Sequence, residues 1–237
     1  MGSLEAYRSF IECQIRCTGK GLGEHLHEGS APFVTLSRQT GAGGISIGRY
    51  LVAYLDEHDQ KSTCPWTVID KHLIEQVLDQ HHLPREFEQY MPEKKNSEIQ
   101  DIMETLFSLH PPIFALVRRT SETMLRLAQM GNVILVGRGA NIVTRGLKGG
   151  FHVRLIGSLE RRVHHIAEYD GLNLEEAERK IKLEDRGRRD YVKQNFGKDI
   201  EDPLLYDLTI NTDRIPYDRV AELIGSEVLK SQPGVTV

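Results

Sequence analysis

The segment 34-VTLSRQTGAGGISIGRYLVAYL-55 brings together residues that could hold a phosphate group. An apolar run precedes a glycine-rich turn, and apolar residues then recur every fourth position, which predicts strand, turn and helix. Backbone N–H groups of such a turn can surround an anion, and the helix adds the positive end of its dipole. The expected phosphate cradle is Gly41, Ala42, Gly43, Gly44, Ile45 and Ser46.

The turn departs from the usual phosphate-binding pattern at its charged position. That pattern, G-x-x-x-x-G-K-S/T, ends in a lysine that reaches the phosphates. Gly43 matches the second glycine, but Arg38 stands at the first glycine and Gly44 at the lysine. Arg38 is therefore the candidate replacement charge, since a guanidinium binds phosphate through two hydrogen bonds. The alternative is a tight turn without a ligand. Ser46 could place its hydroxyl near a metal-bound phosphate.

Two further candidates follow other apolar runs. Arg138 lies between two glycines directly after the run 133–137, and we expect it to bind the phosphate of an acceptor. Asp70 closes the run 66–70, where it could orient the acceptor or hold Mg²⁺ through water. The alternatives are structural: a salt bridge for Arg138, and a cap on the next helix for Asp70.

The segment 186-RGRR-189 holds three arginines in a long charged region, 174–195, which is expected to be one helix or a helix pair. Arginines suit phosphoryl transfer because that reaction depends on positioning and charge neutralisation. We favour Arg186 and Arg189 over Arg188 for this role. The alternative is an exposed, charged helix face.

Alternating elements must position these residues. Strands are predicted at 33–37, 66–70, 133–137, 151–156 and 207–211, with helices between them. This alternation is typical of an α/β fold with a parallel sheet and three layers. Binding sites in such folds lie at the carboxyl ends of the strands, where the candidate residues fall.

The composition fits a cytoplasmic globular protein of one large domain. The chain has 237 residues and a net charge of −4, which argues against non-specific nucleic-acid binding over the whole surface. No apolar run approaches the roughly 18 residues of a membrane span. Cys13, Cys17 and Cys64 imply no disulfide framework and are expected to be idle thiols. The histidines, including His165, lack the spacing of a metal site and are expected on the surface.

Four regions carry a resemblance to a known family. They are 35-TLSRQTGAGG-44, 69-IDKHLI-74, 136-VGRGA-140, and 184-EDRGRRDY-191 with 206-YDLTINT-212. Together they resemble the cytidylate kinase-like family, relatives of bacterial cytidylate kinase among the P-loop nucleoside monophosphate kinases. The sequence departs from cytidylate kinase proper where Gly44 replaces the catalytic lysine. It departs again where Val136 and Gly139 replace the two aspartates of a D-G-R-D loop.

The resemblance implies a three-layer P-loop kinase fold with a five-stranded parallel sheet, and ATP and Mg²⁺ as cofactors. It places this domain at 33–230. Before the domain, the spacing of the apolar residues in 4–17 predicts a short helix, and 1–32 is expected to be a helical extension and linker. A helical acceptor-binding insertion is expected at about 71–118 and a lid at about 171–203. Asp70, Arg138 and Gly139 would bind the acceptor, and Arg186 and Arg189 would close over the phosphates. Lys71, Lys94 and Lys95 are acceptor-site candidates by location alone.

Three functions remain open from the sequence. The first is an ATP-dependent phosphotransferase acting on a nucleoside monophosphate or another small acceptor. The second is a nucleotide-binding or anion-sensing module without turnover, because the usual lysine is missing. The third, which the net charge disfavours, is a nucleic-acid factor with a basic patch at 186–198. The N-terminal helix could bind a partner, and a homo-oligomer is possible.

Overall fold

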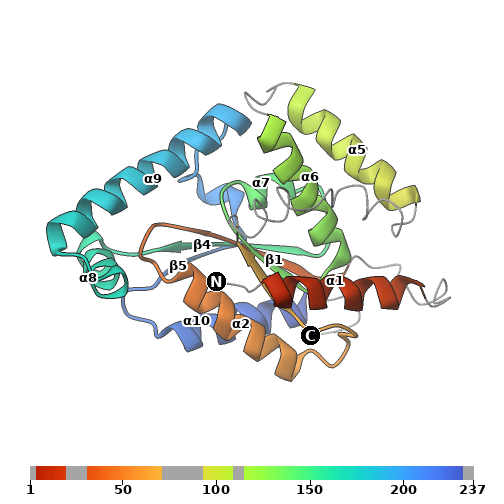
Figure 1. The fold of residues 1–237 in the computed structure, drawn as a ribbon, viewed down its shortest axis with the longest axis horizontal. Helices are drawn as coiled ribbons and strands as arrows, with labels where there is room; N and C mark the ends of the chain where they lie inside the picture. The colour runs from red at the N-terminus through yellow and green to blue at the C-terminus, as the bar shows by residue number, and fades with distance from the viewer. Residues whose placement is uncertain (1–3, 20–30, 71–92, 109–114, 232–237) are drawn as a thin grey trace.

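A five-stranded parallel sheet forms the centre of the molecule, with strand order β2-β3-β1-β4-β5 (Figure 1). The computed structural model describes residues 4–19, 31–70, 93–108 and 115–231. The strands are β1 (Phe33–Arg38), β2 (Thr67–Asp70), β3 (Val133–Val136), β4 (Gly150–Ile156) and β5 (Leu208–Asn211). All five predicted strands are confirmed, and so is the α/β class with its parallel sheet.

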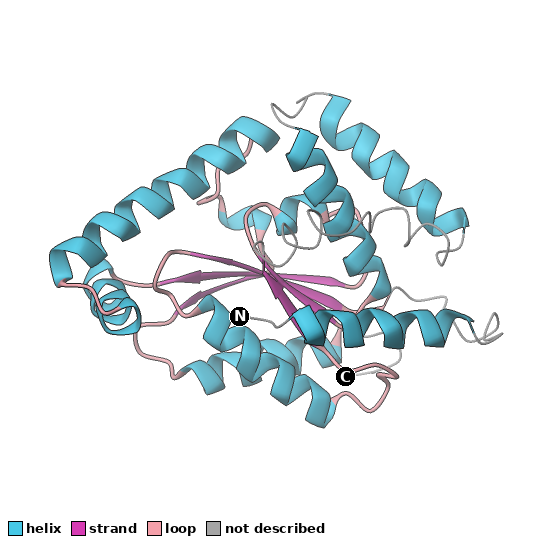
Figure 2. Ribbon diagram, in the orientation of Figure 1, coloured by secondary structure: helices cyan, strands magenta, loops and turns pink. Residues whose placement is uncertain are grey.

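Helices cover both faces of the sheet and complete the three layers (Figure 2). They are α1 (Leu4–Gly19), α2 (Gly44–His58), α5 (Glu93–Ser108), α6 (Ala115–Met130), α7 (Ala140–Val143), α8 (Leu159–Asp170), α9 (Leu174–Phe196) and α10 (Tyr217–Lys230), with a 3₁₀ turn at Pro203–Leu205. Within this described part of the chain, no helix has both the length and the apolar character needed to cross a membrane.

Two apolar cores lie on the two faces of the sheet. On β1, Val34 and Leu36 point to the core that α2 and α10 cover, whereas Phe33 points to the opposite core. This alternation follows from the period of two along a strand. The opposite core is covered by α1, α5, α6 and α7 together with the C-terminal part of α9. The sheet is therefore buried on both faces, which fixes the carboxyl ends of β1, β2 and β3 relative to one another.

Helix α1 is part of this packing. Tyr7 and Phe10 are almost fully buried in the core that also contains Phe33 and Ile69. The N-terminal helix was predicted correctly from its apolar spacing, but its packing on the domain was not. The expectation of three idle thiols is wrong for two of them, because Cys13 of α1 forms a disulfide with Cys64.

The region expected to hold the lid contains one long helix. Helix α9 runs unbroken over 23 residues and begins with a capping box, in which Asn173 and Glu176 each satisfy a backbone N–H of the other. The N-cap of helix α8 is Ser158, whose side chain accepts a hydrogen bond from the N–H of Arg161. The region expected to hold the helical insertion contains α5, a helix of 16 residues, within its described part.

Candidate functional site

The glycine-rich turn joins β1 to α2 in a conformation that needs glycine at two positions. Gly41 and Gly43 have φ angles of 85° and 79°, in the left-handed region that other residues rarely adopt. Gly43 is the N-cap of α2 and supplies no side-chain hydrogen bond. The first N–H groups of an α-helix have no partner within the helix. The start of α2 therefore presents donors and a positive dipole end to the space in front of it.

Both glycines are also required by close packing. A β-carbon at Gly41 would lie 2.8 Å from the carbonyl oxygen of Arg162, and one at Gly43 would overlap the ring of Tyr217. The turn is thus held between α8 and the start of α10. Because Arg162 and Tyr217 pack directly against Gly41 and Gly43, the backbone of the turn is held in one conformation.

The side chain of Arg38 lies over Gly44, at the position where the usual loop carries lysine. A β-carbon on Gly44 would be 3.0 Å from Arg38 Cγ and 3.3 Å from Arg38 Cδ. Glycine at position 44 therefore leaves the space that the arginine occupies. Arg38 ends β1 and Gly44 begins α2, so the two residues face each other across the turn. The structure brings together the two departures from the usual pattern.

The surroundings of Arg38 identify its charged neighbours. The pKa of Arg38 is lowered to about 10; burial is the largest cause, and the positive charges of Arg188 and Arg138 act in the same direction. The carboxylates of Asp70 and Glu184 act in the opposite direction. At this pKa the guanidinium keeps its charge at neutral pH. Two other arginines close enough to repel Arg38 make this a place where an anion would be stabilised.

These groups line one cleft of about 510 Å³ at the carboxyl ends of β1, β2 and β3. Its wall contains most of the predicted cradle and several predicted acceptor residues. The lining residues are Arg38, Gln39, Thr40, Gly41, Gly43, Gly44, Ile45, Ser46, Asp70, Arg138, His165, Ile166, Tyr169, Asp170, Lys180, Glu184 and Arg188. Two predicted cradle and acceptor residues, Ala42 and Gly139, are buried and do not line it.

Helix α9 is hydrogen-bonded to the glycine-rich turn through Thr40. The N–H of Thr40 donates to Asp185 Oδ1 at 2.8 Å, and its hydroxyl lies 2.9 Å from Asp185 and 3.1 Å from Glu184. Arg162 of α8 joins both sides, since it donates to the Thr40 carbonyl at 3.1 Å and to Asp185 at 2.6 Å. Arg162 thus connects α8 to both the glycine-rich turn and α9.

The pKa of Asp185 reflects this arrangement. Burial is the largest influence and would raise this pKa. The hydrogen bonds from the Thr40 N–H, from Arg162 and from the Thr40 hydroxyl lower it, as does the positive charge of Arg162, and together they outweigh burial. The pKa therefore lies below its ordinary value. Asp185 stays ionised and ties three separate segments together.

Arg188 lines the cleft, and the arginines favoured from the sequence do not. The side chain of Arg188 is 14% exposed and pairs with Glu184 at 2.9 Å, while that of Arg186 is 77% exposed and pairs with Asp190. Arg189 is also exposed. The reason is helical periodicity: Lys180, Glu184 and Arg188 are four residues apart and share one face, and Arg186 falls on the other. Arg186 and Arg189 thus lie away from the cleft in this structure, and their role in phosphoryl transfer stays a prediction.

Arg138 reaches the cleft from the end of β3. Its guanidinium lies 5.1 Å from the ring centroid of Tyr191 of α9, a cation–π contact that orients it. Of the basic residues that line the cleft, Lys180 and Arg188 form ion pairs with described residues, whereas no such pair involves Arg38 or Arg138. The salt-bridge alternative for Arg138 thus finds no partner there. Gly139, the N-cap of the short helix α7, has φ of 76°, and a β-carbon on it would collide with Phe196.

His165 is a site residue that the sequence reasoning placed on the surface. Its Nδ1 lies 2.8 Å from the carbonyl oxygen of Gly41, so the protonated nitrogen donates to the glycine-rich turn. Tyr217 packs edge-on against its ring. The only available signal was its position one turn after Arg162 on the same helix.

Three predicted acceptor-site lysines are not described by the structure. Lys71 falls outside the described residues, and so do the side chains of Lys94 and Lys95.

For Mg²⁺, the cleft offers the Ser46 hydroxyl and the Asp70 carboxylate, which are the hard oxygen donors that this ion prefers. Two donors fit an ion that keeps several waters and is held mainly by bound phosphates.

The fold and the cleft define an α/β protein with a glycine-rich strand-to-helix turn at the end of its first strand. The sequence profile described as the cytidylate kinase-like family matches residues 33–214, most of the chain. The chain belongs to the cytidylate kinase-like family.

Individual relatives are more distant. Cytidylate kinase of Methanopyrus kandleri is 31% identical over 109 residues, which cover 43% of this chain and 56% of that protein. Cytidylate kinase of Pyrococcus horikoshii is 28% identical over 120 residues, which cover 51% of this chain and 60% of that protein. The chain thus matches little more than half the length of these relatives.

A solved structure supports the fold alone. An uncharacterized protein from Eubacterium ventriosum superposes with a TM-score of 0.60 at 16% identity, covering 83% of this chain and 98% of that one. The family match therefore indicates a kinase-like protein, and it leaves the activity and the acceptor open.

Proposed function

We propose that this protein is an ATP-dependent phosphotransferase that acts on a nucleoside monophosphate or another small phosphorylated or hydroxylated acceptor. The observation that carries the proposal is the position of Arg38. Its side chain crosses Gly44 into the cleft, with Asp70, Arg138 and Arg188 as charged neighbours. Arg38 thus supplies the positive charge that a lysine at position 44 would carry in the usual loop.

The donor side of the reaction uses the glycine-rich turn. The N–H groups at Gly41 to Ser46 would hold the phosphates of ATP, because the turn is rigid and its first-turn donors face the cleft. Arg38 and Arg188 would neutralise charge on the transferred group, and such preorganised charge is the main source of catalysis in phosphoryl transfer. When bound, Mg²⁺ would neutralise part of the phosphate charge, with Ser46 and Asp70 as its protein ligands.

The acceptor side lies at the ends of β2 and β3. These strands are neighbours, and Asp70 is paired in register with Val136, two residues before Arg138. Arg138, oriented by Tyr191, would bind an acceptor phosphate, and Asp70 would orient the acceptor hydroxyl or phosphate. Gly139 contributes by letting Phe196 pack behind this loop. Helix α9 would act as the lid, and the hydrogen bond between Thr40 and Asp185 joins it to the turn.

The experiment is a test of nucleotide consumption by the full chain. ATP and Mg²⁺ are supplied with a panel of nucleoside monophosphates, and ADP formation is measured for each. The proposal expects ADP formation that depends on one acceptor and disappears when Mg²⁺ is chelated. Acceptor-independent hydrolysis at the same rate throughout would contradict it. A thermal-shift screen with small phosphorylated metabolites extends the panel, since a ligand that binds only the folded state raises its stability.

A second function, nucleotide binding without turnover, is favoured by one observation. The lysine position is Gly44, and the lysine that does line the cleft, Lys180, is already paired with Asp170 at 3.0 Å. The expected result for this function is that ATP binds with Mg²⁺ and raises the unfolding temperature, but no acceptor in the panel leads to ATP consumption. That result would establish the second function in place of the first.

A further inference from the structure

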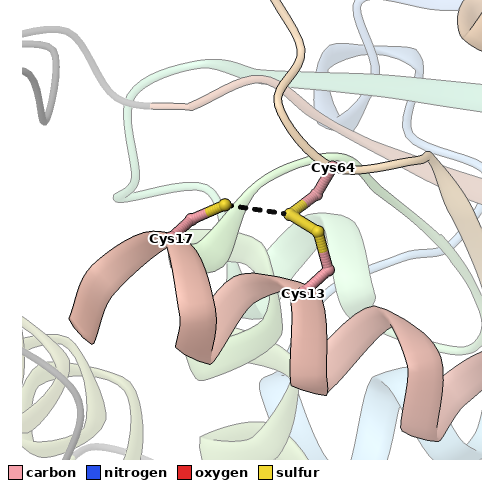
Figure 3. A group of neighbouring side chains, drawn as sticks. All are labelled: Cys13, Cys17 and Cys64. Carbon is pink, nitrogen blue, oxygen red and sulfur yellow. Dashed lines mark hydrogen bonds between the residues drawn. A yellow bond between two sulfur atoms is a disulfide. The ribbon is translucent and has the colours of Figure 1, made fainter. Parts of the chain in front are cut away.

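Three sulfur atoms meet on the side of the domain where β2 begins. Cys13 and Cys17 lie one turn apart on α1, and Cys64 lies in the loop before β2 (Figure 3). Cys13 and Cys64 form a disulfide that joins positions 51 residues apart, with a Cα–Cα distance of 5.9 Å. Cys17 is a free thiol, and its Sγ lies 3.5 Å from Sγ of Cys64. All three sulfurs lie within 4.8 Å of one another.

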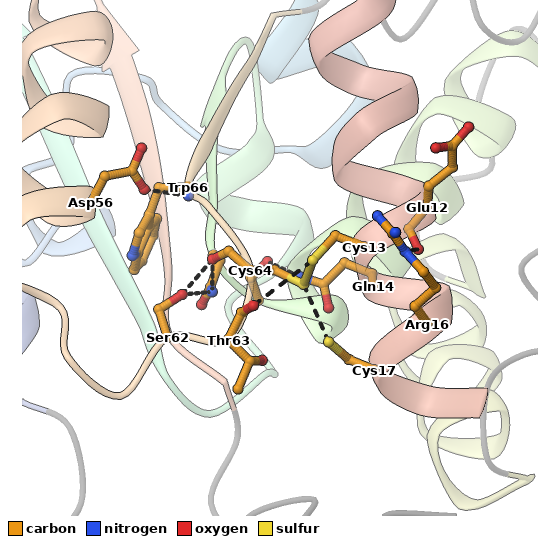
Figure 4. The surroundings of a disulfide bond; sticks show 12 residues. Glu12, Cys13, Gln14, Arg16, Cys17, Asp56, Ser62, Thr63, Cys64 and Trp66 are labelled. Atoms are coloured by element: carbon orange, nitrogen blue, oxygen red, sulfur yellow. Dashed lines mark hydrogen bonds between the residues drawn. A yellow bond between two sulfur atoms is a disulfide. The ribbon is translucent and has the colours of Figure 1, made fainter. Parts of the chain in front are cut away.

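Cys64 is the fixed member of this group. It is 3% exposed, and its carbonyl oxygen accepts a hydrogen bond from the Asn132 side chain at 2.7 Å. A second hydrogen bond comes from the Ser62 hydroxyl (Figure 4). Two residues on, the backbone N–H of Trp66 donates to Asp56 at 2.7 Å. The loop that carries Cys64 is therefore held on both sides by side chains of the domain.

Cys13 and Cys17 are the alternative partners of this fixed sulfur. Residues four apart on a helix lie on the same face, so both thiols point from α1 toward Cys64 (Figure 3). At 3.5 Å, the Cys17 sulfur is at the distance at which reacting atoms lie before a bond forms. Cys13 Sγ lies 3.8 Å from the carbonyl oxygen of Thr63, which would accept a hydrogen bond from the Cys13 thiol once that thiol is released.

We infer that Cys13, Cys17 and Cys64 form a reversible thiol–disulfide site in which Cys64 is the shared sulfur and α1 is the element that the bond fastens to the domain. The chemical class of its substrate is a low-molecular-weight disulfide. This site lies at the start of β2, whereas the phosphate-binding cleft lies at the strand ends, so the inference stands apart from the proposed kinase function.

The chemistry of the site has two balanced steps. In the first, two thiols, Cys13 and Cys64, lose two electrons and two protons, and the external disulfide gains them and becomes two thiols. In the second, the Cys17 thiolate attacks Sγ of Cys64, the bond between Cys64 and Cys13 breaks, and Cys13 leaves as a thiolate that takes up a proton. The second step needs no external oxidant.

The test is disulfide mapping on the full chain in a glutathione redox buffer. Free thiols are blocked, the protein is digested, and the bridged peptides are identified by mass spectrometry. Wild type and Cys17→Ser should both contain the 13–64 bridge, and wild type should keep one blocked thiol. Cys13→Ser should contain a bridge between Cys17 and Cys64. Cys64→Ser should contain no bridge between α1 and the loop.

Thermal unfolding supplies the second measurement and shows that each variant folds. Oxidation should raise the unfolding midpoint of wild type and of Cys17→Ser by roughly 5 to 10 °C, because the bridge restricts the unfolded chain. Cys64→Ser should unfold cooperatively and show no such rise. Two results would overturn the inference: Cys13→Ser without a bridge between Cys17 and Cys64, or reduced wild type that binds one equivalent of Zn²⁺ and then resists oxidation, since three thiolates also suit zinc.

Discussion

The side chain of Arg38 occupies the space that opens above Gly44, with its Cγ 3.0 Å from the position that a β-carbon on Gly44 would take. The two substitutions in the phosphate-binding pattern are therefore coupled by geometry. Any side chain at position 44 would require Arg38 to shift by a few tenths of an ångström, and glycine at 44 without the arginine would leave the loop without a charge. The expected function depends on this pair.

Replacing Gly44 with alanine tests the pairing at the smallest scale. The added methyl group pushes Arg38 by a few tenths of an ångström, so we expect ATP affinity to fall by roughly 10-fold while the fold persists. Titration calorimetry with ATP and Mg²⁺ measures the change. Gly187→Ala on α9 is the matched control, because nothing lies within 4 Å of its new β-carbon. The control should bind ATP normally and gain about 0.5–1 kcal/mol in stability from helix propensity. Unchanged ATP affinity in Gly44→Ala would contradict the coupling.

Arg188 and Arg186 differ by two residues and should differ strongly in function. Arg188→Ala removes a guanidinium from the wall of the cleft and is expected to lower kcat on the order of 100-fold. Arg186→Ala removes an exposed side chain paired with Asp190 and should leave kcat within 2-fold, since such surface pairs contribute about 0–1 kcal/mol. Steady-state ADP formation compares the two variants. If both variants lost kcat equally, the prediction would fail, and Arg186 would remain the residue favoured from the sequence.

The bond between Thr40 and Asp185 predicts an acid-sensitive contribution to stability. The pKa of Asp185 is lower in the folded protein than its ordinary value of 3.8. Its stabilising effect is therefore complete above that value and is lost as the pH falls through the lower, folded pKa. Asp185→Asn should destabilise the protein by about 3 kcal/mol at neutral pH, because it leaves Arg162 without its charge partner.

Urea unfolding of both proteins from about pH 6 to about pH 2 checks this expectation, with reductant present so that the disulfide does not contribute. The difference between wild type and Asp185→Asn should shrink at the acid end. A difference that stays constant across the range would mean that Asp185 acts through packing rather than charge.

The sheet and the turn could be predicted because their signals are local. Each strand is a short apolar run, and Gly41 and Gly43 sit where a strand gives way to a helix. The spacing of Lys180, Glu184 and Arg188 also indicates a shared helix face. The choice of Arg186 and Arg189 follows instead from the density of arginines in 186-RGRR-189. A helical wheel over 174–195 would have placed Arg188, and not Arg186, on the face of its acidic partners.

Other features depend on contacts between distant positions. His165 meets Gly41 across 124 residues, and Cys13 meets Cys64 across 51. Neither pair carries a spacing that periodicity can detect, because the sheet topology alone brings these segments together. The packing of α1 is a similar case: its apolar face was visible in the sequence, but the surface that it covers was not.

The most direct test is a single-turnover measurement of phosphoryl transfer from labelled ATP to the acceptor that the panel identifies, with wild type and Arg38→Ala compared at saturating Mg²⁺. The account predicts transfer in wild type and a loss on the order of 100- to 1,000-fold in Arg38→Ala, the usual effect of removing one preorganised charge from a transition state. Arg38→Ala that transfers phosphate at the wild-type rate would contradict it.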